Sequence, residues 1–259
     1  MRDKLKRSAV PGLLLALALL LGACGAGPAA PTAAPAETQS QTTPEPTPEP
    51  TPEPTEPPRL GPDLPALYPV DDSYFEDAAF FGNSLMVGLK LYGGLEAGDF
   101  IAGTSANVVN VGQMCPEGMG ESRSMLDVLC ARPYGKIYLH LGINEIGFDT
   151  DYFAQLYGQL IDRIQAKQPD AAIIITSLTP VTASKSAQGE TFSQTRVLRY
   201  NEALHQLAED KGCYYLDLVS ALAGPDGFLP ADASTDGVHL TPEMYEVWAD
   251  WMRTHYVPV

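Results

Sequence analysis

The sequence predicts an α/β fold in which a five-stranded parallel sheet lies between two layers of helices. Short apolar runs alternate with longer segments whose apolar residues recur every three or four positions, as in amphipathic helices. The run at residues 171–176 is apolar almost throughout, as in a strand that helices cover on both faces. Alternating strands and helices, joined by right-handed crossovers, give a parallel sheet of this kind.

The expected strands are short runs of mostly apolar residues, and they cover residues 78–81, 100–102, 136–141, 171–176 and 213–218. The expected helices have helical spacing or clear end signals, and they cover residues 85–92, 122–131, 151–167, 195–211 and 242–255. The helix at 151–167 has the most regular pattern and ends before Pro169. Gly212 ends the following helix, while Thr241 and Pro242 suit the N-cap and first turn of the last one.

The first 23 residues have the features of a targeting segment. Four basic residues stand within the first seven positions, and an apolar run at 13–21 follows that is too short to span a bilayer. The run ends in Leu21-Gly22-Ala23-Cys24, which resembles the lipobox of bacterial lipoproteins. That resemblance implies a signal peptide at 1–23, a lipid on Cys24 and an extracytoplasmic protein held at the membrane. An ordinary secretory signal is the alternative.

Residues 24–59 are expected to form a linker. They contain Thr-Pro-Glu-Pro repeats between Thr43 and Thr55 and no periodic apolar pattern, so they cannot bury enough surface to fold. Proline-rich chains extend by about 3.1 Å per residue, which gives this segment a reach of roughly 100 Å. Residues 60–259 are then the folded domain, which is long enough for one sizeable core.

The charge of the chain narrows the classes of partner. The whole chain has 32 acidic and 16 basic residues, and residues 60–259 have 26 and 11. Nucleic-acid binding needs a basic face, so this balance argues against it. An acidic surface also suits neutral substrates better than polyanions. The four histidines form no HExxH or His-x-His pattern, and no metal or cofactor is expected.

Candidate catalytic side chains follow three of the expected strands: the first, the third and the fifth. Ser84, in Gly82-Asn83-Ser84-Leu85, lies where a strand turns into a helix, and Asn144 follows the strand that stops at Gly142. Asp236 and His239 lie three residues apart after the last strand, a spacing that lets the carboxylate orient the imidazole. Sites in parallel α/β sheets form outside the carboxyl ends of the strands. Together these residues indicate acyl transfer.

In this order the motifs resemble the blocks of the SGNH hydrolases, also called the GDSL esterase and lipase family, over residues 76–256. The resemblance implies a flavodoxin-like three-layer α/β/α sandwich. It also implies ester hydrolysis by Ser84, His239 and Asp236 without metal or cofactor. The oxyanion would be bound by the backbone N–H of Ser84, by the amide of Asn144 and by a second backbone N–H after the second strand.

Two positions depart from the family pattern. Asn83 stands where the family has aspartate, which is not a member of the triad. The second backbone donor is Ala106 if Gly103-Thr104-Ser105-Ala106 is laid over the family's Gly-x-Ser-Gly, and Gly103 if the first residue after the strand is taken. A backbone N–H does not require glycine, so both alternatives remain open.

The expected substrate is a short acyl ester, above all an O-acetyl group on a cell-wall or extracellular glycan. The alternatives are a lysophospholipase-like acylhydrolase and a catalytically inactive binding module. Only Asn83, which replaces the family's aspartate, supports the inactive module. Export would permit a disulfide between Cys115 and Cys130. His140 lies within a strand and is expected to be a packed core residue.

Overall fold

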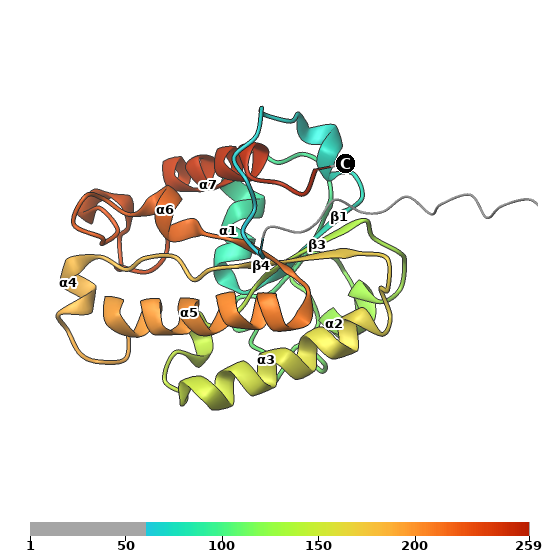
Figure 1. Ribbon diagram of the computed structural model, residues 1–259, viewed down its shortest axis with the longest axis horizontal. Coiled ribbons are helices and arrows are strands. Elements are labelled where there is room, and N and C mark those ends of the chain that lie inside the picture. Colours follow the sequence, from blue (N-terminus) through green and yellow to red (C-terminus); the bar gives the residue numbers. More distant parts are fainter. Residues whose placement is uncertain (1–60, 259) are drawn as a thin grey trace, which may run out of the picture. The chain divides into compact units, whose positions relative to one another are not determined.

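The computed structural model describes residues 61–258, so the expected signal peptide at 1–23, Cys24 and the linker at 24–59 lie outside the described residues. The five strands form one parallel sheet in the order β2-β1-β3-β4-β5. This confirms the predicted five-stranded α/β/α fold (Figure 1). Within residues 61–258, no helix combines the length and the apolar character that crossing a bilayer requires.

The strands have bounds close to the predicted ones: β1 (Ala78–Gly82), β2 (Asp99–Ala102), β3 (Lys136–His140), β4 (Ala172–Thr176) and β5 (Tyr214–Leu216). All five residues of β1 are buried, because β2 and β3 flank this strand and helices cover both faces of the sheet. The ring of Phe80 in β1 stacks on those of Phe100 in β2 and Tyr138 in β3, with ring centroids 4.5 and 5.3 Å apart. These aromatic contacts fix the relative positions of the three strands.

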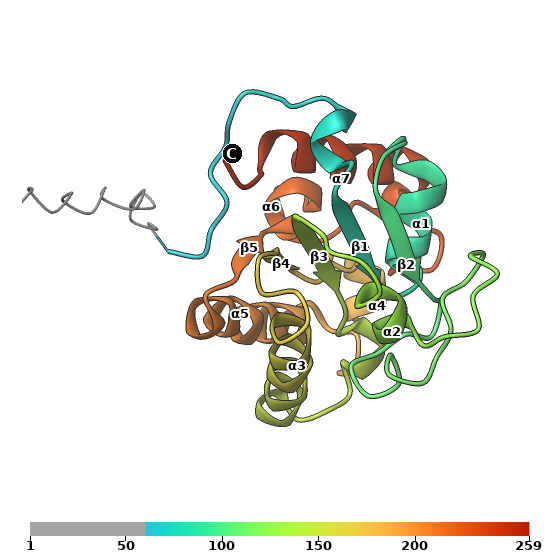
Figure 2. The ribbon, with the colours of Figure 1, turned by 90° about the vertical axis from the view of Figure 1, so that its right-hand side faces the viewer.

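The helices are α1 (Ser84–Tyr92), α2 (Met125–Leu129), α3 (Thr150–Gln165), α4 (Ala183–Ser186), α5 (Gln194–Lys211), α6 (Leu218–Leu222) and α7 (Pro242–Thr254). Three short 3-10 turns join them: η1 (Asp72–Phe75), η2 (Ile143–Glu145) and η3 (Ala231–Ala233). Helices α1, α6 and α7 pack together on one face of the sheet, and α3 and α5 pack against each other on the other face (Figure 2).

Two elements are shorter than the sequence predicts, and in both cases a capping side chain sets the limit. The helix expected at 122–131 covers only Met125–Leu129, because the hydroxyl of Ser124 caps it by accepting the N–H of Asp127 at 3.1 Å. The strand expected at 213–218 ends at Leu216, because the Asp217 side chain caps α6. The sequence did not predict α6, because the apolar residues of the strand and of the helix form one nearly continuous run.

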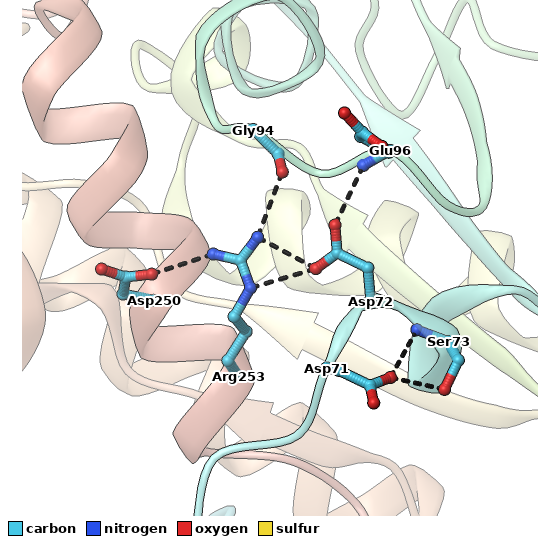
Figure 3. A network of polar contacts seen from close by, with 7 residues as sticks. All are labelled: Asp71, Asp72, Ser73, Gly94, Glu96, Asp250 and Arg253. Atoms are coloured by element: carbon cyan, nitrogen blue, oxygen red, sulfur yellow. Dashed lines mark hydrogen bonds and ion pairs between the residues drawn. The ribbon is translucent and has the colours of Figure 1, made fainter.

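Residues 61–75 form a strap along one side of the domain. The strap begins at β5, where the N–H of Leu64 donates to the Tyr215 carbonyl at 3.1 Å. It continues to the end of α7, where Arg253 donates two hydrogen bonds to the Asp72 carboxylate, at 3.1 and 3.0 Å. Arg253 also binds the Gly94 carbonyl at 3.1 Å, so it joins the strap, α7 and the segment after α1 (Figure 3).

Candidate active site

Ser84 is the first residue of α1 and lies just after the carboxyl end of β1. The turn before it is tight: a side chain at Gly82 would place its Cβ 2.5 Å from the carbonyl oxygen of His140, so glycine is required there. Asn83 caps α1, with its Oδ1 accepting the N–H of Leu85 at 3.0 Å. Asn83 therefore supplies the cap, but its amide nitrogen is buried without an acceptor among the described residues.

The structure brings the three predicted residues of the triad into contact. Ser84 Oγ lies 2.9 Å from His239 Nε2, and His239 Nδ1 lies 2.6 Å from Asp236 Oδ2. A carboxylate only accepts hydrogen bonds, so Nδ1 carries the ring proton and Nε2 is left to accept the proton of the serine hydroxyl. This is the chain of contacts that a serine nucleophile, a base and an orienting acid require.

The loop itself holds the Asp236 carboxylate. Its Oδ1 accepts the backbone N–H of Val238 at 2.9 Å and that of His239 at 2.8 Å. Burial raises the pKa of Asp236, but the hydrogen bonds from the His239 ring and these two N–H groups outweigh it and hold the pKa below its usual range. The carboxylate therefore stays ionised where its charge can stabilise a protonated His239.

Helix α4 supports this loop from the side. The N–H of Thr182 donates to the Gly237 carbonyl at 3.1 Å, and the side chain of Lys185 packs against Gly237. Gly237 has φ +87°, and a Cβ there would lie 2.5 Å from that of Lys185. Both the backbone conformation and the lack of space therefore require glycine between Asp236 and His239.

The two candidates for the second oxyanion donor already have acceptors. The N–H of Gly103 donates to the Gly82 carbonyl at 3.1 Å, and the N–H of Ala106 donates to the Gly103 carbonyl at 2.9 Å. Within residues 61–258, the N–H groups of Ser84 and Ser105 make no hydrogen bond. Ser84 therefore has the free N–H that an oxyanion hole needs, while the choice between Gly103 and Ala106 stays a prediction.

Asn144 lies in η2, directly after β3, and its side chain is exposed. Its amide nitrogen donates to the carbonyls of Ala106, at 2.9 Å, and Thr104, at 3.4 Å. The structure thus brings Asn144 against the loop that carries both backbone candidates. The bond to Ala106 occupies one of the two amide hydrogens.

Comparison with known proteins agrees with this geometry. The sequence profile of the GDSL-like lipase/acylhydrolase family matches residues 80–247, which is more than half of the chain. The chain belongs to this family. The matched stretch begins within β1 and contains Ser84, Asn144, Asp236 and His239. Family membership makes the protein a hydrolase of the GDSL-like acylhydrolase type.

Solved structures share the fold of this GDSL-like domain. One from Streptococcus pneumonia, provisionally named a platelet activating factor, is 20% identical, covers 68% of this chain and 82% of its own, and has a TM-score of 0.54. A Bacteroides thetaiotaomicron GDSL-like lipase is 13% identical, covers 66% of this chain and 83% of its own, and has a TM-score of 0.50. A Bacteroides fragilis protein, provisionally named an acylhydrolase, is 15% identical, covers 67% of this chain and 83% of its own, and has a TM-score of 0.51. A search of curated proteins found no match.

One buried carboxyl of the GDSL-like domain escaped the sequence reasoning. Glu145, next to Asn144, is only 1% exposed, and its Oε1 accepts the N–H of Val108 at 2.6 Å. Burial raises its pKa to about 7. No sequence signal indicated that the loop after β2 (the β2 loop, residues 103–108) would cover this side chain.

His140 lies in the core of the GDSL-like domain, as predicted. Its Nδ1 is 2.7 Å from the hydroxyl of Thr176, which itself donates to the Leu139 carbonyl at 3.0 Å. Nδ1 must therefore be the donor in this pair. Burial lowers the pKa of His140 to about 3, so the ring is neutral.

The disulfide that export would permit is not formed. Cys115 and Cys130 are both free thiols, and the Cys115 sulfur lies 3.4 Å from the carbonyl of Ser122. Between residues 61 and 258, no group of three or more His, Cys, Asp or Glu side chains is placed to hold a metal ion.

Proposed function

We propose that this domain is a serine ester hydrolase that removes short acyl groups, acetyl above all, from glycans outside the cytoplasm. The observation that carries the proposal is the continuous chain from Ser84 Oγ through the His239 ring to the Asp236 carboxylate. A hydroxyl, a base and an orienting carboxylate at these distances are the parts of an acyl-transfer mechanism.

In the first half of the reaction, Ser84 Oγ attacks the ester carbonyl carbon and His239 Nε2 takes the hydroxyl proton. The carbonyl oxygen becomes an oxyanion, which the free N–H of Ser84 stabilises at the positive end of α1. The carbon–oxygen bond to the alcohol then breaks, and His239 gives its proton to the departing alkoxide. The products are an acyl-serine and a free sugar hydroxyl.

In the second half, His239 takes a proton from water, and the resulting hydroxide attacks the acyl-serine. The tetrahedral species collapses, and the proton returns from His239 to Ser84 Oγ. A carboxylic acid leaves. Asp236 keeps its negative charge throughout and stabilises the imidazolium that forms twice in each cycle.

The surroundings of Ser84 support a short acyl group. Two hollows within residues 61–258, of about 250 and 290 Å³, are lined by residues other than those of the triad. The first is lined by residues 130–134 and 167–171, and the second lies beside α5 and β5. A long acyl chain needs contiguous apolar surface next to the nucleophile, whereas residues 103–107, directly after β2, are small or polar.

Exposed aromatic and acidic side chains at the start of α3, a few residues after Asn144 in the chain, support a glycan as the group that carries the ester. Phe148 and Tyr152 are 39% and 53% exposed, and their ring centroids are 6.0 Å apart. The exposed carboxylates of Asp149 and Asp151 lie between them in the chain. Aromatic rings can pack on the apolar face of a sugar, and carboxylates accept hydrogen bonds from its hydroxyl groups.

The proposal extends to location. A lipid on Cys24 and an extended linker up to residue 59 would let the domain work at a distance from the membrane. The acidic surface favours neutral glycans over anionic lipid as the target. Both statements rest on the sequence alone.

Rates on p-nitrophenyl acetate, butyrate and octanoate test the acyl preference. We expect kcat/KM to be highest for acetate, since each extra methylene gains affinity only where apolar surface receives it. A preference for octanoate would instead support the lysophospholipase-like alternative. No cleavage of any of the three would support the inactive binding module.

The glycan is tested with an acetylated xylo- or chito-oligosaccharide. Phe148→Ala and Tyr152→Ala should raise KM for the oligosaccharide and leave p-nitrophenyl acetate unaffected. Tyr92→Ala is the matched control, because Tyr92 is 47% exposed and stacked on Tyr245 at 6.0 Å, at the far end of α1 from Ser84. Equal effects of all three variants would contradict the glycan assignment.

A further inference from the structure

Two consecutive residues after β3 hold the same loop after β2. Asn144 donates its amide to the Ala106 carbonyl at 2.9 Å, and the Glu145 carboxylate accepts the Val108 N–H at 2.6 Å. The held segment, Ala106–Val108, overlaps at Ala106 with the stretch that contains the candidate oxyanion donors, Gly103–Ala106. These two hydrogen bonds therefore connect the β2 loop to the turn after β3.

Glu145 has little freedom to move. Its N–H donates to the Gly142 carbonyl at 3.1 Å, and its own carbonyl accepts the N–H of Phe148 at 2.7 Å and the hydroxyl of Tyr200 at 2.8 Å. The side chain is 1% exposed. The carboxylate thus forms a fixed point that faces the β2 loop.

The carboxyl group is costly at this position. Its second oxygen, Oε2, is buried and has no hydrogen-bond donor among the described residues. An apolar side chain of similar size would avoid this desolvation. An apolar side chain would not accept the N–H of Val108. The hydrogen bond to the β2 loop is therefore what the carboxyl group of Glu145 provides.

No nearby cation neutralises this carboxyl group among the residues that the structure describes. The titratable side chains that face it are Tyr157 on α3 and Tyr200 on α5, and burial raises the pKa of both well above neutrality. The guanidinium of Arg196 on α5 binds the Ile146 carbonyl at 3.0 Å instead. With neutral neighbours, burial is the main cause that raises the pKa of Glu145 to about 7.

We propose that Glu145 is a positioning residue for ester hydrolysis, which holds the β2 loop through Val108 so that the stretch Gly103–Ala106, in which the N–H of Ser105 makes no hydrogen bond to the described residues, is positioned for the oxyanion beside Ser84. Glu145 does not touch the ester. The inference rests on the proposed Ser84 mechanism, and it adds that the β2 loop must be held from outside because its own hydrogen bonds do not fix it to β3.

The proposal predicts a specific kinetic signature. Donors to the oxyanion act in the transition state, so a misaligned loop lowers kcat and leaves KM nearly unchanged. Losing one donor costs about 10²–10³ in kcat, and misalignment costs part of that. We expect Glu145→Leu to lower kcat at least tenfold, with KM within twofold. Glu145→Gln keeps an oxygen acceptor and should retain kcat within about threefold of wild type.

Gln168 provides a matched control at the opposite end of the sheet. It is also buried, at 4% exposure, and it also bridges backbone groups, donating to the carbonyls of Leu129 at 2.8 Å and Arg132 at 2.7 Å. Gln168→Leu should lower stability about as much as Glu145→Leu without changing kcat. If Glu145→Leu does not fold, the flexible apolar variant Glu145→Met takes its place.

The test measures kcat and KM on p-nitrophenyl acetate together with hydrogen exchange of the Val108 amide. We expect faster exchange of that amide in Glu145→Leu, and protection restored in Glu145→Gln. The proposal is overturned if the folded Glu145→Leu variant keeps its kcat, or if Gln168→Leu loses as much. The exchange measurement needs no turnover, so an inactive wild type would refute the proposed function while the loop contact is still tested.

Discussion

Asp236 holds His239 at two points: its Oδ2 lies 2.6 Å from the ring nitrogen Nδ1, and its Oδ1 accepts the backbone N–H at 2.8 Å. The two residues form a closed unit within four positions of the chain. The direction of the imidazole is therefore set locally, and the fold has only to bring this unit to Ser84.

Asp236→Asn should lower kcat by about 10⁴, because a neutral amide keeps the size of the side chain but neither orients the ring tautomer nor stabilises its charged form. Initial rates on p-nitrophenyl acetate give the value. A loss below tenfold would show that Asp236 is not the orienting acid.

The same aspartate makes a prediction about stability at low pH. Its pKa is lowered in the folded protein, so its contribution to folding is complete above the ordinary value of 3.8 and is lost as the pH falls further. Acid unfolding is followed by circular dichroism, with Glu202→Gln as the control: this variant removes an exposed carboxylate but keeps Asp236, so it should lose stability below pH 4 as steeply as wild type. With the linkage present, wild type should lose stability below pH 4 more steeply than Asp236→Asn.

Ser84→Ala should abolish ester turnover and leave the fold intact, because only the nucleophilic oxygen is removed and alanine suits the first turn of a helix. Turnover and the circular dichroism spectrum are measured on the same sample. More than a few per cent of the wild-type rate would mean that the nucleophile is elsewhere.

Asn83→Ala should destabilise the domain by about 1 kcal/mol, since the Leu85 N–H loses its capping acceptor. It should also lower kcat, because Ser84 directly follows the cap. Urea unfolding measures the first effect. Ser124→Ala removes a similar cap from α2 and is the control: its stability loss should be comparable, and its kcat should equal that of wild type.

Glu145→Gln should become more stable relative to wild type as the pH rises from 5 to 8. The pKa of Glu145 is raised to about 7, so between its ordinary value of 4.5 and pH 7 the folded state holds a proton that the unfolded state has lost. Wild-type stability therefore falls over this range, by up to roughly 3 kcal/mol, and glutamine has no such loss. Urea unfolding at pH 5 and pH 8 measures the difference, and a pH-independent difference would refute it.

Cys24→Ser should block lipidation. The motif Leu21-Gly22-Ala23-Cys24 predicts a thiol that carries a lipid, and serine cannot replace it. Cells fed a labelled fatty acid should label the wild-type protein and not the variant. Label in the variant, or none in the wild type, would refute the anchor.

The sequence was sufficient to predict a parallel sheet of five strands that alternate with helices, and to select Ser84, Asp236 and His239, which the structure brings into contact. Each strand is a short apolar run, so the sequence also indicates where each strand ends. The candidate triad residues were found by searching the segments that follow these ends. The limits of α2 and β5 were not predictable, because the side chains of Ser124 and Asp217 interrupt an apolar pattern that continues past them.

The hydrogen bonds of the β2 loop were beyond the sequence. The N–H groups of Gly103 and Ala106 both have carbonyl acceptors because of the turn that the backbone makes, and residue types alone do not determine that turn. The burial of Glu145 likewise depends on Val108, 37 positions away, and no periodic pattern connects the two residues.

The strap gives the domain a defined response to mechanical force. A pull on the chain before residue 61 reaches first the hydrogen bonds of Pro62 and Leu64 with Tyr215 in β5. It then reaches those of Leu67 and Val70 with the end of α7, and after them the pair formed by Asp72 and Arg253. Ser84 comes later in the chain, at the start of α1. Tension on a tethered copy would thus be borne by the strap before any of it reached the triad.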